Sequence, residues 1–262
     1  MTEIVAIHSF RGGTGKSNVT ANLAGQLAAA GKRVCVIDTD IQSPGIHVLF
    51  GYVDGDLPAH TLNEFLNGSA PINEVAIDVT SRLPQQVSGS VELVASSIAP
   101  ADISDILRNG YDVERLYDAL VRLGSSRNLD YLLIDTHPGL NEETLLTTAI
   151  CDVLIVIMRP DNQDYQGTAV TLDVAARLGV PNRLIVVNKV YEAIDPAVVS
   201  TRVEQAYGLP VAAALPLAQT VASNASSGLF SLTNPDHAWS GGIRQLTAQL
   251  LATTDHTTSP KA

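Results

Sequence analysis

Short apolar runs alternate along this chain with longer stretches in which apolar residues recur every three or four positions. The apolar runs are nearly continuous in Val, Ile and Leu, which is typical of strands that are covered on both faces. They predict strands at residues 4–8, 34–38, 91–95, 131–135, 153–158, 183–188 and 211–215. The longer stretches predict helices at residues 18–30, 113–123, 141–149, 167–178, 196–207 and 242–251.

This alternation of strands and helices indicates an α/β fold with a mainly parallel sheet and helices on both faces. Residues 51–60 and 83–89 are rich in polar residues, glycine and proline, so we expect surface loops there. Residues 253–262 are polar and end in Ser-Pro-Lys-Ala. We therefore expect a single domain over residues 1–252 and a flexible tail at 253–262.

Composition narrows the class of protein. Hydrophobic residues make up 45% of the 262 residues, which excludes disorder over most of the chain. The net charge of −11 argues against general affinity for nucleic acid or anionic membrane. The two cysteines, Cys35 and Cys151, lie in or beside apolar runs and are expected to be reduced core thiols. No apolar run approaches the ~20 residues of a membrane span, and the chain enters its first strand without a targeting segment, so we expect a cytoplasmic protein.

A glycine-rich loop follows the first predicted strand and opens the first predicted helix. It reads Phe-Arg-Gly-Gly-Thr-Gly-Lys-Ser over residues 10–17. Glycines let the backbone curl so that several N–H groups point at one anion, and the helix N-terminus favours negative charge there. Lys16 is placed to reach the β- and γ-phosphates of a nucleotide, and the Ser17 hydroxyl to bind Mg²⁺. The loop therefore predicts a site for a nucleoside triphosphate.

Acidic residues end two of the predicted strands. Asp38 and Asp40 follow the apolar run 34–37, and Asp135 ends the run 131–134. Residues at the carboxyl ends of parallel strands face the ligand crevice. Two neighbouring carboxylates repel each other unless a cation or water lies between them. The pattern indicates a cation or a water network beside these acids; the alternative is that they only cap the strand ends.

Residues 11–17 resemble the deviant Walker motif of the ParA/MinD family of P-loop ATPases, and the resemblance extends over nearly the whole chain. Arg11 stands where that family has its signature lysine, and Phe10 stands where P-loops in general have a glycine. The family's signature lysine crosses a dimer interface to the partner's nucleotide. Arginine keeps the charge and offers a forked donor for phosphate. By this resemblance, Arg11 is expected to act across a homodimer.

The resemblance also implies roles for the other motifs. Residues 38–40 resemble switch I, in which Asp40 positions the attacking water and Asp38 supports the Mg²⁺ shell. Residues 135–139 resemble switch II, with Asp135 at Mg²⁺ and the Gly139 N–H at the γ-phosphate; we expect His137, in place of a proline, to be a tolerated surface substitution. The resemblance implies three catalytic residues, which are Lys16, Asp40 and Arg11. The expected nucleotide contacts are Arg11, Gly12, Gly13, Thr14, Gly15, Lys16, Ser17, Asn18, Gly139, Asn188, Pro216, Leu217 and Ala218.

Some of these residues keep two interpretations. Asn188 follows the strand 183–187 and corresponds to the family's reader of the adenine edge, but it is equally placed for a helix cap. Pro216 belongs to a segment that resembles the adenine-packing loop, but it also suits a plain turn. Arg159 follows another strand and is either a second cation near the nucleotide or half of a strand-end salt bridge.

The expected function is an ATP-dependent, dimerising switch that positions or partitions a cargo and hydrolyses ATP slowly until a partner protein stimulates it. ATP and Mg²⁺ are the expected cofactors. Only Arg244 is basic in the last predicted helix, so we expect core packing and no stable membrane binding. Nonspecific DNA binding stays open, through Arg177, Arg183, Lys189, Arg202 and Arg244. The alternatives are a metabolic P-loop enzyme with a dethiobiotin-synthase-like fold and a nucleotide-binding regulator with negligible turnover.

Overall fold

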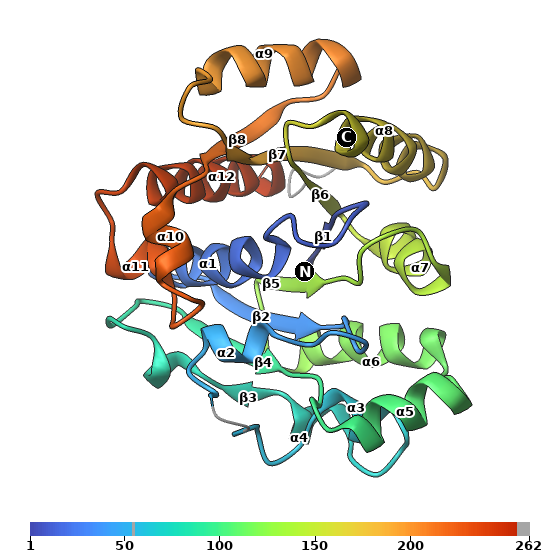
Figure 1. The fold of residues 1–262 in the computed structure, drawn as a ribbon. Helices are drawn as coiled ribbons and strands as arrows, with labels where there is room; N and C mark the ends of the chain where they lie inside the picture. Colours follow the sequence, from blue (N-terminus) through green and yellow to red (C-terminus); the bar gives the residue numbers. More distant parts are fainter. Residues whose placement is uncertain (54–55, 256–262) are drawn as a thin grey trace.

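One eight-stranded sheet forms the centre of the molecule in the computed structural model, which describes residues 1–53 and 56–255. The strand order is β3-β4-β2-β5-β1-β6-β7-β8, and Figure 1 shows the sheet with helices on either side. All neighbouring strands are parallel except β3 and β4, which are antiparallel. The predicted α/β fold with a mainly parallel sheet is confirmed.

All seven strands predicted from the apolar runs are present. The strands are β1 (Glu3–His8), β2 (Arg33–Asp38), β3 (Ile77–Asp78), β4 (Ser90–Val94), β5 (Tyr131–Asp135), β6 (Val153–Met158), β7 (Asn182–Val190) and β8 (Val211–Pro216). The short edge strand β3 was not predicted. In the register of β2 and β5, Asp38 lies opposite Asp135, so the two predicted acidic strand ends are neighbours.

The predicted helices are also present, together with several that the periodicity did not indicate. The main helices are α1 (Lys16–Ala29), α5 (Pro100–Asn109), α6 (Val113–Ser126), α7 (Glu142–Ile150), α8 (Asn162–Arg177), α9 (Pro196–Tyr207) and α12 (Ala238–Asp255). The short ones are α2 (Ile46–Leu49), α3 (Leu62–Leu66), α4 (Ile72–Val75), η1 (Thr80–Arg82), α10 (Gln219–Ser223) and α11 (Phe230–Thr233).

Several helices extend beyond their predicted ends, and α8 and α12 show why. Helix α8 begins at Asn162 rather than at residue 167, because the Asp161 side chain accepts hydrogen bonds from the N–H groups of Gln163 and Asp164 and caps the helix. Helix α12 continues to Asp255, so residues 253–255 of the expected tail are helical. The Thr254 hydroxyl pairs with the Tyr131 hydroxyl at 2.7 Å, which holds this helix end to β5. Residues 256–262 of the expected tail lie outside the described residues.

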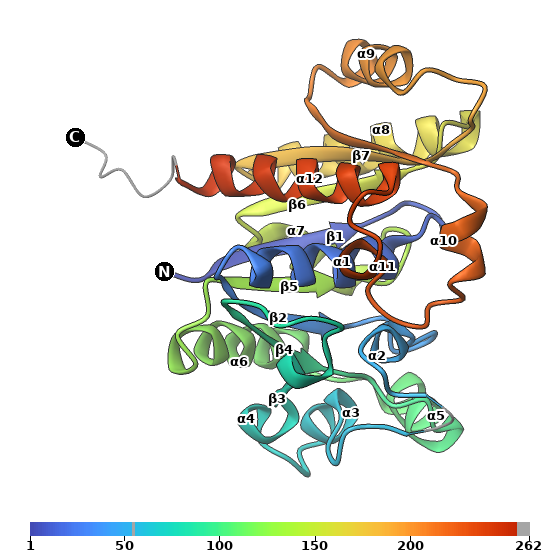
Figure 2. The ribbon, with the colours of Figure 1, turned by 90° about the vertical axis from the view of Figure 1, so that its left-hand side faces the viewer.

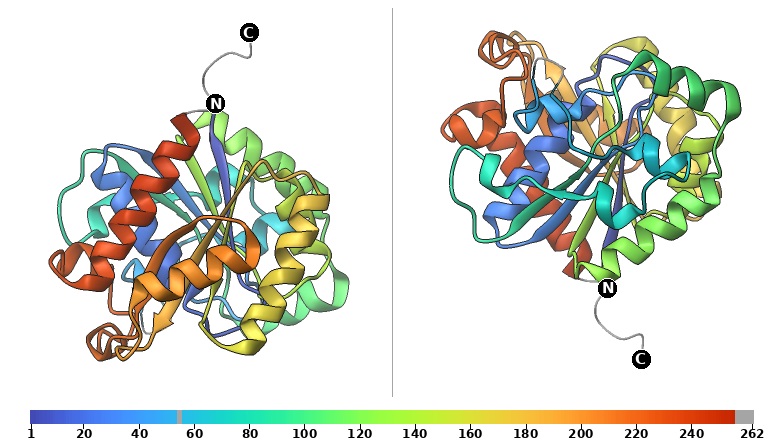
Figure 3. Two further views of the ribbon diagram at one scale, coloured as in Figure 1. Left: turned by 90° about the horizontal axis from the view of Figure 1, so that it is seen from above. Right: turned by 90° about the horizontal axis from the view of Figure 1, so that it is seen from below.

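The sheet separates two hydrophobic cores. Alternate residues of β1 point to opposite sides: Val5 and Ile7 join one core, Ile4 and Ala6 the other. Helices α1, α2, α11 and α12 pack in the first core, and α3 to α9 in the second. Figures 2 and 3 show these two helical layers on either side of the strands. Among the described residues, no helix is long and apolar enough to cross a membrane.

Candidate functional site

The glycine-rich loop joins β1 to α1 at the carboxyl edge of the sheet. Gly13 and Gly15 have φ values of 76° and 91°, a left-handed region that favours glycine. Gly15 is the N-cap of α1 and has no side chain to occupy the first N–H groups of the helix. The loop therefore presents backbone N–H groups and the positive end of a helix to one small space, as a phosphate group requires.

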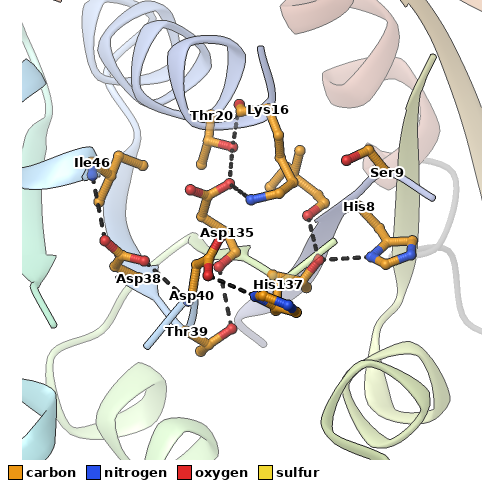
Figure 4. Close-up of polar contacts among 12 residues, drawn as sticks. His8, Ser9, Lys16, Thr20, Asp38, Thr39, Asp40, Ile46, Asp135 and His137 are labelled. Carbon is orange, nitrogen blue, oxygen red and sulfur yellow. Dashed lines mark hydrogen bonds and ion pairs between the residues drawn. The ribbon is translucent and has the colours of Figure 1, made fainter. Parts of the chain in front are cut away.

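Lys16 is buried at the first turn of α1 and lies next to a strand-end acid. Its Nζ donates to Asp135 Oδ1 at 2.8 Å (Figure 4). The Thr20 hydroxyl lies 3.2 Å from the same oxygen, while Asp135 Oδ2 is buried without a hydrogen-bond partner among the described residues. Lys16 and Asp135 thus hold each other at the floor of the site, and one carboxylate oxygen is left for a further ligand.

Asp38 is buried, and its carboxylate organises the segment that follows β2. Its Oδ1 accepts the Asp40 N–H at 3.1 Å, and its Oδ2 accepts the N–H groups of Gly45 and Ile46 at 3.1 Å and 3.3 Å. Burial, followed by the charge of Asp135, raises the pKa of Asp38 to about 7. Asp38 therefore shapes the loop that carries Asp40, and the two buried carboxylates repel each other, so a cation beside them would be stabilising.

Asp40 pairs with a histidine that the sequence analysis placed at the surface. His137 Nδ1 lies 2.7 Å from Asp40 Oδ1, with side-chain exposures of 23% and 14% (Figure 4). The expectation that His137 is merely a tolerated surface substitution is wrong, because its ring is partly buried against the switch I carboxylate. The contact links switch I to switch II.

Two adjoining cavities surround the first turn of α1. One, of about 220 Å³, is lined by Ser9, Gly12, Gly13, Thr14, Gly15, Lys16, Ser17, Asn18, Asp40 and Pro138. The other, of about 260 Å³, is lined by Gly15, Asn18, Asn188, Lys189, Pro216, Leu217, Ala218, Val221, Ala222, Ala225, Ser226 and Trp239. Gly15 and Asn18 line both, so the two cavities adjoin at the first turn of α1.

The end of β7 holds the phosphate loop in place. The Asn188 amide donates to the Thr14 carbonyl at 2.7 Å, and its own oxygen accepts the Lys189 N–H at 2.9 Å. Lys189 Nζ donates to the Gly13 carbonyl at 2.7 Å. Both side chains therefore fix carbonyls of the loop, which leaves its N–H groups for an anion. This role of Lys189 was not predicted from the sequence; the adjacency of Lys189 to Asn188 was the available signal.

The two candidate interface arginines have different surroundings. Arg159 Nε and Nη2 each donate to Asp164 at 3.0 Å, and the pKa of Asp164 is lowered, against the effect of burial, by hydrogen bonds from Arg159. Arg159 therefore forms the strand-end salt bridge, which was one of its two interpretations. The Arg11 side chain makes no hydrogen bond or ion pair with any residue that the structure describes.

Gly139 ends the segment 135–139 that resembles switch II, and its N–H group already has a hydrogen-bond partner. That N–H donates to the Ser9 carbonyl at 3.1 Å, so contact with a γ-phosphate would require this bond to break. The neighbouring Pro138, and not Gly139, lines the cavity of about 220 Å³ beside the glycine-rich loop, which we call the phosphate cavity. The loop and switch II are joined by this bond in the structure.

Several of the basic residues considered for DNA binding are engaged within the chain. Lys189 binds the phosphate loop, Arg177 pairs with Asp173 at 2.8 Å, and the Arg202 guanidinium lies 5.3 Å from the ring centre of Tyr165. Arg244 donates to the carbonyl of Pro235. Only the Arg177–Asp173 ion pair offsets a positive charge, whereas the other contacts hold Lys189, Arg202 and Arg244 in place without neutralising them.

Several known proteins are similar to this chain in sequence and in fold. Residues 1–251 match the ParA family model described as NUBPL iron-transfer P-loop NTPase. The iron-sulfur cluster carrier protein of Rickettsia conorii is 26% identical over 234 residues, which are 88% of this chain and 66% of that protein. An uncharacterised ATP-binding protein of Methanocaldococcus jannaschii is 26% identical over 252 residues, 96% of this chain and 88% of that protein.

The likeness extends to solved structures. The septum site-determining protein MinD of Pyrococcus horikoshii, complexed with Mg-ADP, superposes with a TM-score of 0.81 at 20% identity, over 99% of this chain and 100% of that one. This similarity concerns the fold. Together with the phosphate loop, the buried Lys16 and the match over residues 1–251, it shows that the chain belongs to the ParA family of P-loop NTPases.

Proposed function

We propose that this protein is an ATP-hydrolysing switch of the ParA/MinD type, which binds ATP with Mg²⁺, dimerises in the ATP-bound state and releases its partner after slow hydrolysis. In this proposal a partner protein stimulates hydrolysis, and the cycle positions or partitions a cargo. The observation that carries the proposal is the phosphate loop at the N-terminus of α1, with Lys16 buried beneath it.

The donor set beneath the loop fits Mg²⁺. Asp135 keeps one buried oxygen without a partner among the residues that the structure describes, and Ser17 lines the phosphate cavity. Carboxylate and hydroxyl oxygens are ligands that Mg²⁺ prefers. We assign Ser17, Asp135 and Asp38 as the residues that would hold the ion. When bound, Mg²⁺ neutralises charge on the β- and γ-phosphates.

The second cavity suits adenine. Pro216 and Leu217 supply apolar surface beside it, as a planar base requires. None of its described lining side chains is a carboxylate, the group best suited to accept from the N–H edge of guanine. Because Asn188 already donates to the loop, we assign it chiefly to holding the loop, with base recognition left to the cavity walls.

Asp40 is the acid we assign to the attacking water. It lines the phosphate cavity, whereas Asp38 and Asp135 do not. Positioning rather than covalent chemistry dominates phosphoryl transfer. With only this carboxylate and Lys16 in one subunit, we expect slow turnover until a second subunit and an activating partner are bound.

Cluster carriage, which the names of several relatives suggest, is not supported by the cysteines of this chain. Iron-sulfur clusters are held by Cys thiolates. Burial raises the pKa of both thiols, that of Cys151 to about 12, and both side chains lie inside the core. The described residues contain no group of three or more His, Cys, Asp or Glu that could hold a metal ion. We therefore do not assign iron-sulfur transfer to these 262 residues.

The test is nucleotide binding and phosphate release. Lys16→Ala removes the charge under the loop and should weaken ATP binding by roughly 2–5 kcal/mol, as for other buried charge-assisted contacts. Calorimetry checks this, with Lys32→Ala at the other end of α1 as the matched lysine control. Unchanged ATP affinity in Lys16→Ala would overturn the assignment of the site. ATP binding by the wild type without any phosphate release would favour a nucleotide-binding regulator instead.

A further inference from the structure

His137 separates the phosphate cavity from a second hollow on the other side of switch I. That hollow, of about 280 Å³, is lined by residues of the two switches and of α5, α6 and α7, among them Thr39, His137 and Glu143. Asp40 lines the phosphate cavity. The contact of Asp40 with His137, drawn in Figure 4, therefore joins a residue that lines one cavity to a residue that lines the other.

We propose that His137 is a positioning residue for ATP hydrolysis, which holds the Asp40 carboxylate toward the phosphate cavity. The inference rests on the proposed function, since it concerns the acid assigned to the attacking water. His137 does not itself line the phosphate cavity, so it acts through Asp40 and not on the nucleotide.

The hydrogen bonds of Asp40 leave one of its oxygens available. Oδ1 accepts from His137 Nδ1 at 2.7 Å and from the Ser43 N–H at 3.2 Å. Oδ2 receives no hydrogen bond from any residue in the described ranges 1–53 and 56–255. A carboxylate fixed through one oxygen presents the other in a constant direction. The second oxygen is therefore the acceptor for water in the phosphate cavity.

The residues on either side of His137 hold its backbone in place. The preceding Thr136 donates its hydroxyl to the Ile7 carbonyl at 3.0 Å and lies 2.8 Å from His8 Nδ1. The following Pro138 restricts the backbone and lines the phosphate cavity. The ring thus extends from a rigid strand end, whereas Asp40 lies in a loop. Because a carboxylate can only accept, the contact requires the tautomer of His137 that carries its proton on Nδ1.

Three substitutions separate the hydrogen bond from the mere presence of a side chain. His137→Ala removes the donor, His137→Asn places an amide nitrogen near the position of Nδ1, and His137→Gln places one near Nε2. Single-turnover phosphate release and ATP affinity should be measured for each. We expect hydrolysis to fall on the order of 10- to 100-fold in the Ala and Gln variants, since small misplacements of a reacting group cost about that much. The Asn variant should stay within a few-fold of wild type.

ATP affinity should be unchanged in all three, because His137 does not line the phosphate cavity. A double substitution supplies a readout that general damage would not give: in an Asp40→Ala background, His137→Ala should have no further effect on hydrolysis. His60→Ala, which breaks an exposed His60–Glu64 pair of 3.2 Å, is the matched control and should hydrolyse like wild type.

Wild-type hydrolysis in His137→Ala, or an equal further loss in the Asp40→Ala background, would overturn the role of His137 and leave the proposed function standing. A wild-type protein that binds ATP and releases no phosphate would instead overturn the proposed hydrolysis, and the role of His137 with it. Wild-type hydrolysis in Asp40→Ala would show that the water is handled elsewhere and would also remove this role.

Discussion

The ring of Phe10 lies against the backbone of Gly167 in the second turn of α8. A Cβ atom added at Gly167 would overlap the ring and Cβ of Phe10. Phe10 occupies the first position of the phosphate loop, where a glycine is usual, so its side chain needs a space that Gly167 provides. The pair joins the loop to α8 and fixes the distance between them.

Gly167→Ala should therefore displace the phosphate loop. The new methyl group must push Phe10 or the helix away, and overpacking of this kind costs typically 1–3 kcal/mol. We expect a lower free energy of unfolding and weaker ATP binding, measured by urea denaturation and calorimetry. Phe10→Ala in the same chain should restore ATP binding, because it removes the group that the methyl meets.

Gly241→Ala is the matched control. Gly241 also lies within a helix, but the nearest atom to an added Cβ is the end of the flexible Arg244 side chain at 3.8 Å. Alanine in a helix is favoured over glycine by roughly 1 kcal/mol, so this variant should be as stable as wild type or more stable. Equal behaviour of the two alanine variants would show that the Phe10 contact does not constrain the loop.

Seven strands were predictable because each is a nearly continuous apolar run. The runs are continuous because the sheet lies between two hydrophobic cores, so the side chains on both faces of a strand are buried. The edge strand β3 has two residues, and α2 to α4 have four or five, so one turn of helix leaves no periodic signal. Helix α5 was missed for another reason: its apolar residues Ile103, Ile106 and Leu107 have helical spacing but cover little more than one turn, and only Ile106 is buried. Length and burial, not helix propensity alone, limited the prediction.

Without the family resemblance, the site was predictable only where residues close in the sequence form it, because Asn188 and residues 216–218 were expected there through the resemblance alone. Residues 10–17 are consecutive, and Asp38, Asp40 and Asp135 follow apolar strands. The pairing of Asp40 with His137 joins residues 97 positions apart and depends on β2 lying beside β5. The apolar runs indicate strands but not their order, so neither this contact nor that of Phe10 with Gly167 could be deduced from them.

Asn188→Ala should weaken nucleotide binding without changing base preference. The Asn188 amide donates to the Thr14 carbonyl, so its loss leaves a loop carbonyl unpaired at a cost of roughly 1–3 kcal/mol. Binding of ATP and of inorganic tripolyphosphate should fall by a similar factor, as measured by calorimetry.

Asn182→Ala, at the other end of β7, is the control for the loss of an asparagine from this strand. Its amide donates to the Asp152 carbonyl at 3.2 Å, far along the strand from the phosphate loop. It should leave tripolyphosphate binding unchanged. A loss confined to ATP in Asn188→Ala, with normal tripolyphosphate binding, would instead identify Asn188 as a reader of the base.

His8 should make the fold sensitive to acid. Burial, with the charge of Lys16 adding to it, lowers the pKa of His8 to about 3 from its usual 6.5. Between these values the unfolded chain binds a proton that the folded chain does not, so stability falls as the pH falls. Between about pH 6 and 4, the free energy of unfolding should therefore fall more steeply in the wild type than in His8→Asn. The difference should reach up to about 1.4 kcal/mol for each pH unit.

Urea unfolding at several pH values measures this difference. The asparagine amide can still donate to the Thr136 hydroxyl, so the variant should fold. Above pH 7 His8 is neutral in both states, and the two stability curves should run parallel there, which serves as an internal control. Curves that stay parallel down to pH 4 would mean that His8 takes up a proton in the folded protein as readily as in the unfolded one.

Arg11 is the residue we expect to complete the site of a second subunit. Its side chain makes no hydrogen bond or ion pair in the described part of the chain, whereas Arg159 is held by Asp164. Two triphosphates that face each other across an interface repel strongly unless cations lie between them. A guanidinium can bind phosphate oxygens with two parallel hydrogen bonds. In the proposed dimer, Arg11 would reach the partner's nucleotide without breaking a hydrogen bond or ion pair to a described residue, whereas Arg159 would have to leave Asp164.

Light scattering on Asp40→Ala with ATP should therefore show a dimer, because ATP persists in that variant. Asp40→Ala/Arg11→Ala should be a monomer under the same conditions, since the phosphates of the two subunits would then lack a bridging charge. Arg177→Ala in the Asp40→Ala background, which removes an exposed arginine at the far end of α8, should stay dimeric. A monomer in all samples would contradict the nucleotide-bridged dimer. A dimer that persists without Arg11 but is lost in Asp40→Ala/Arg159→Ala would assign the bridge to Arg159, and would require its pair with Asp164 to open on ATP binding.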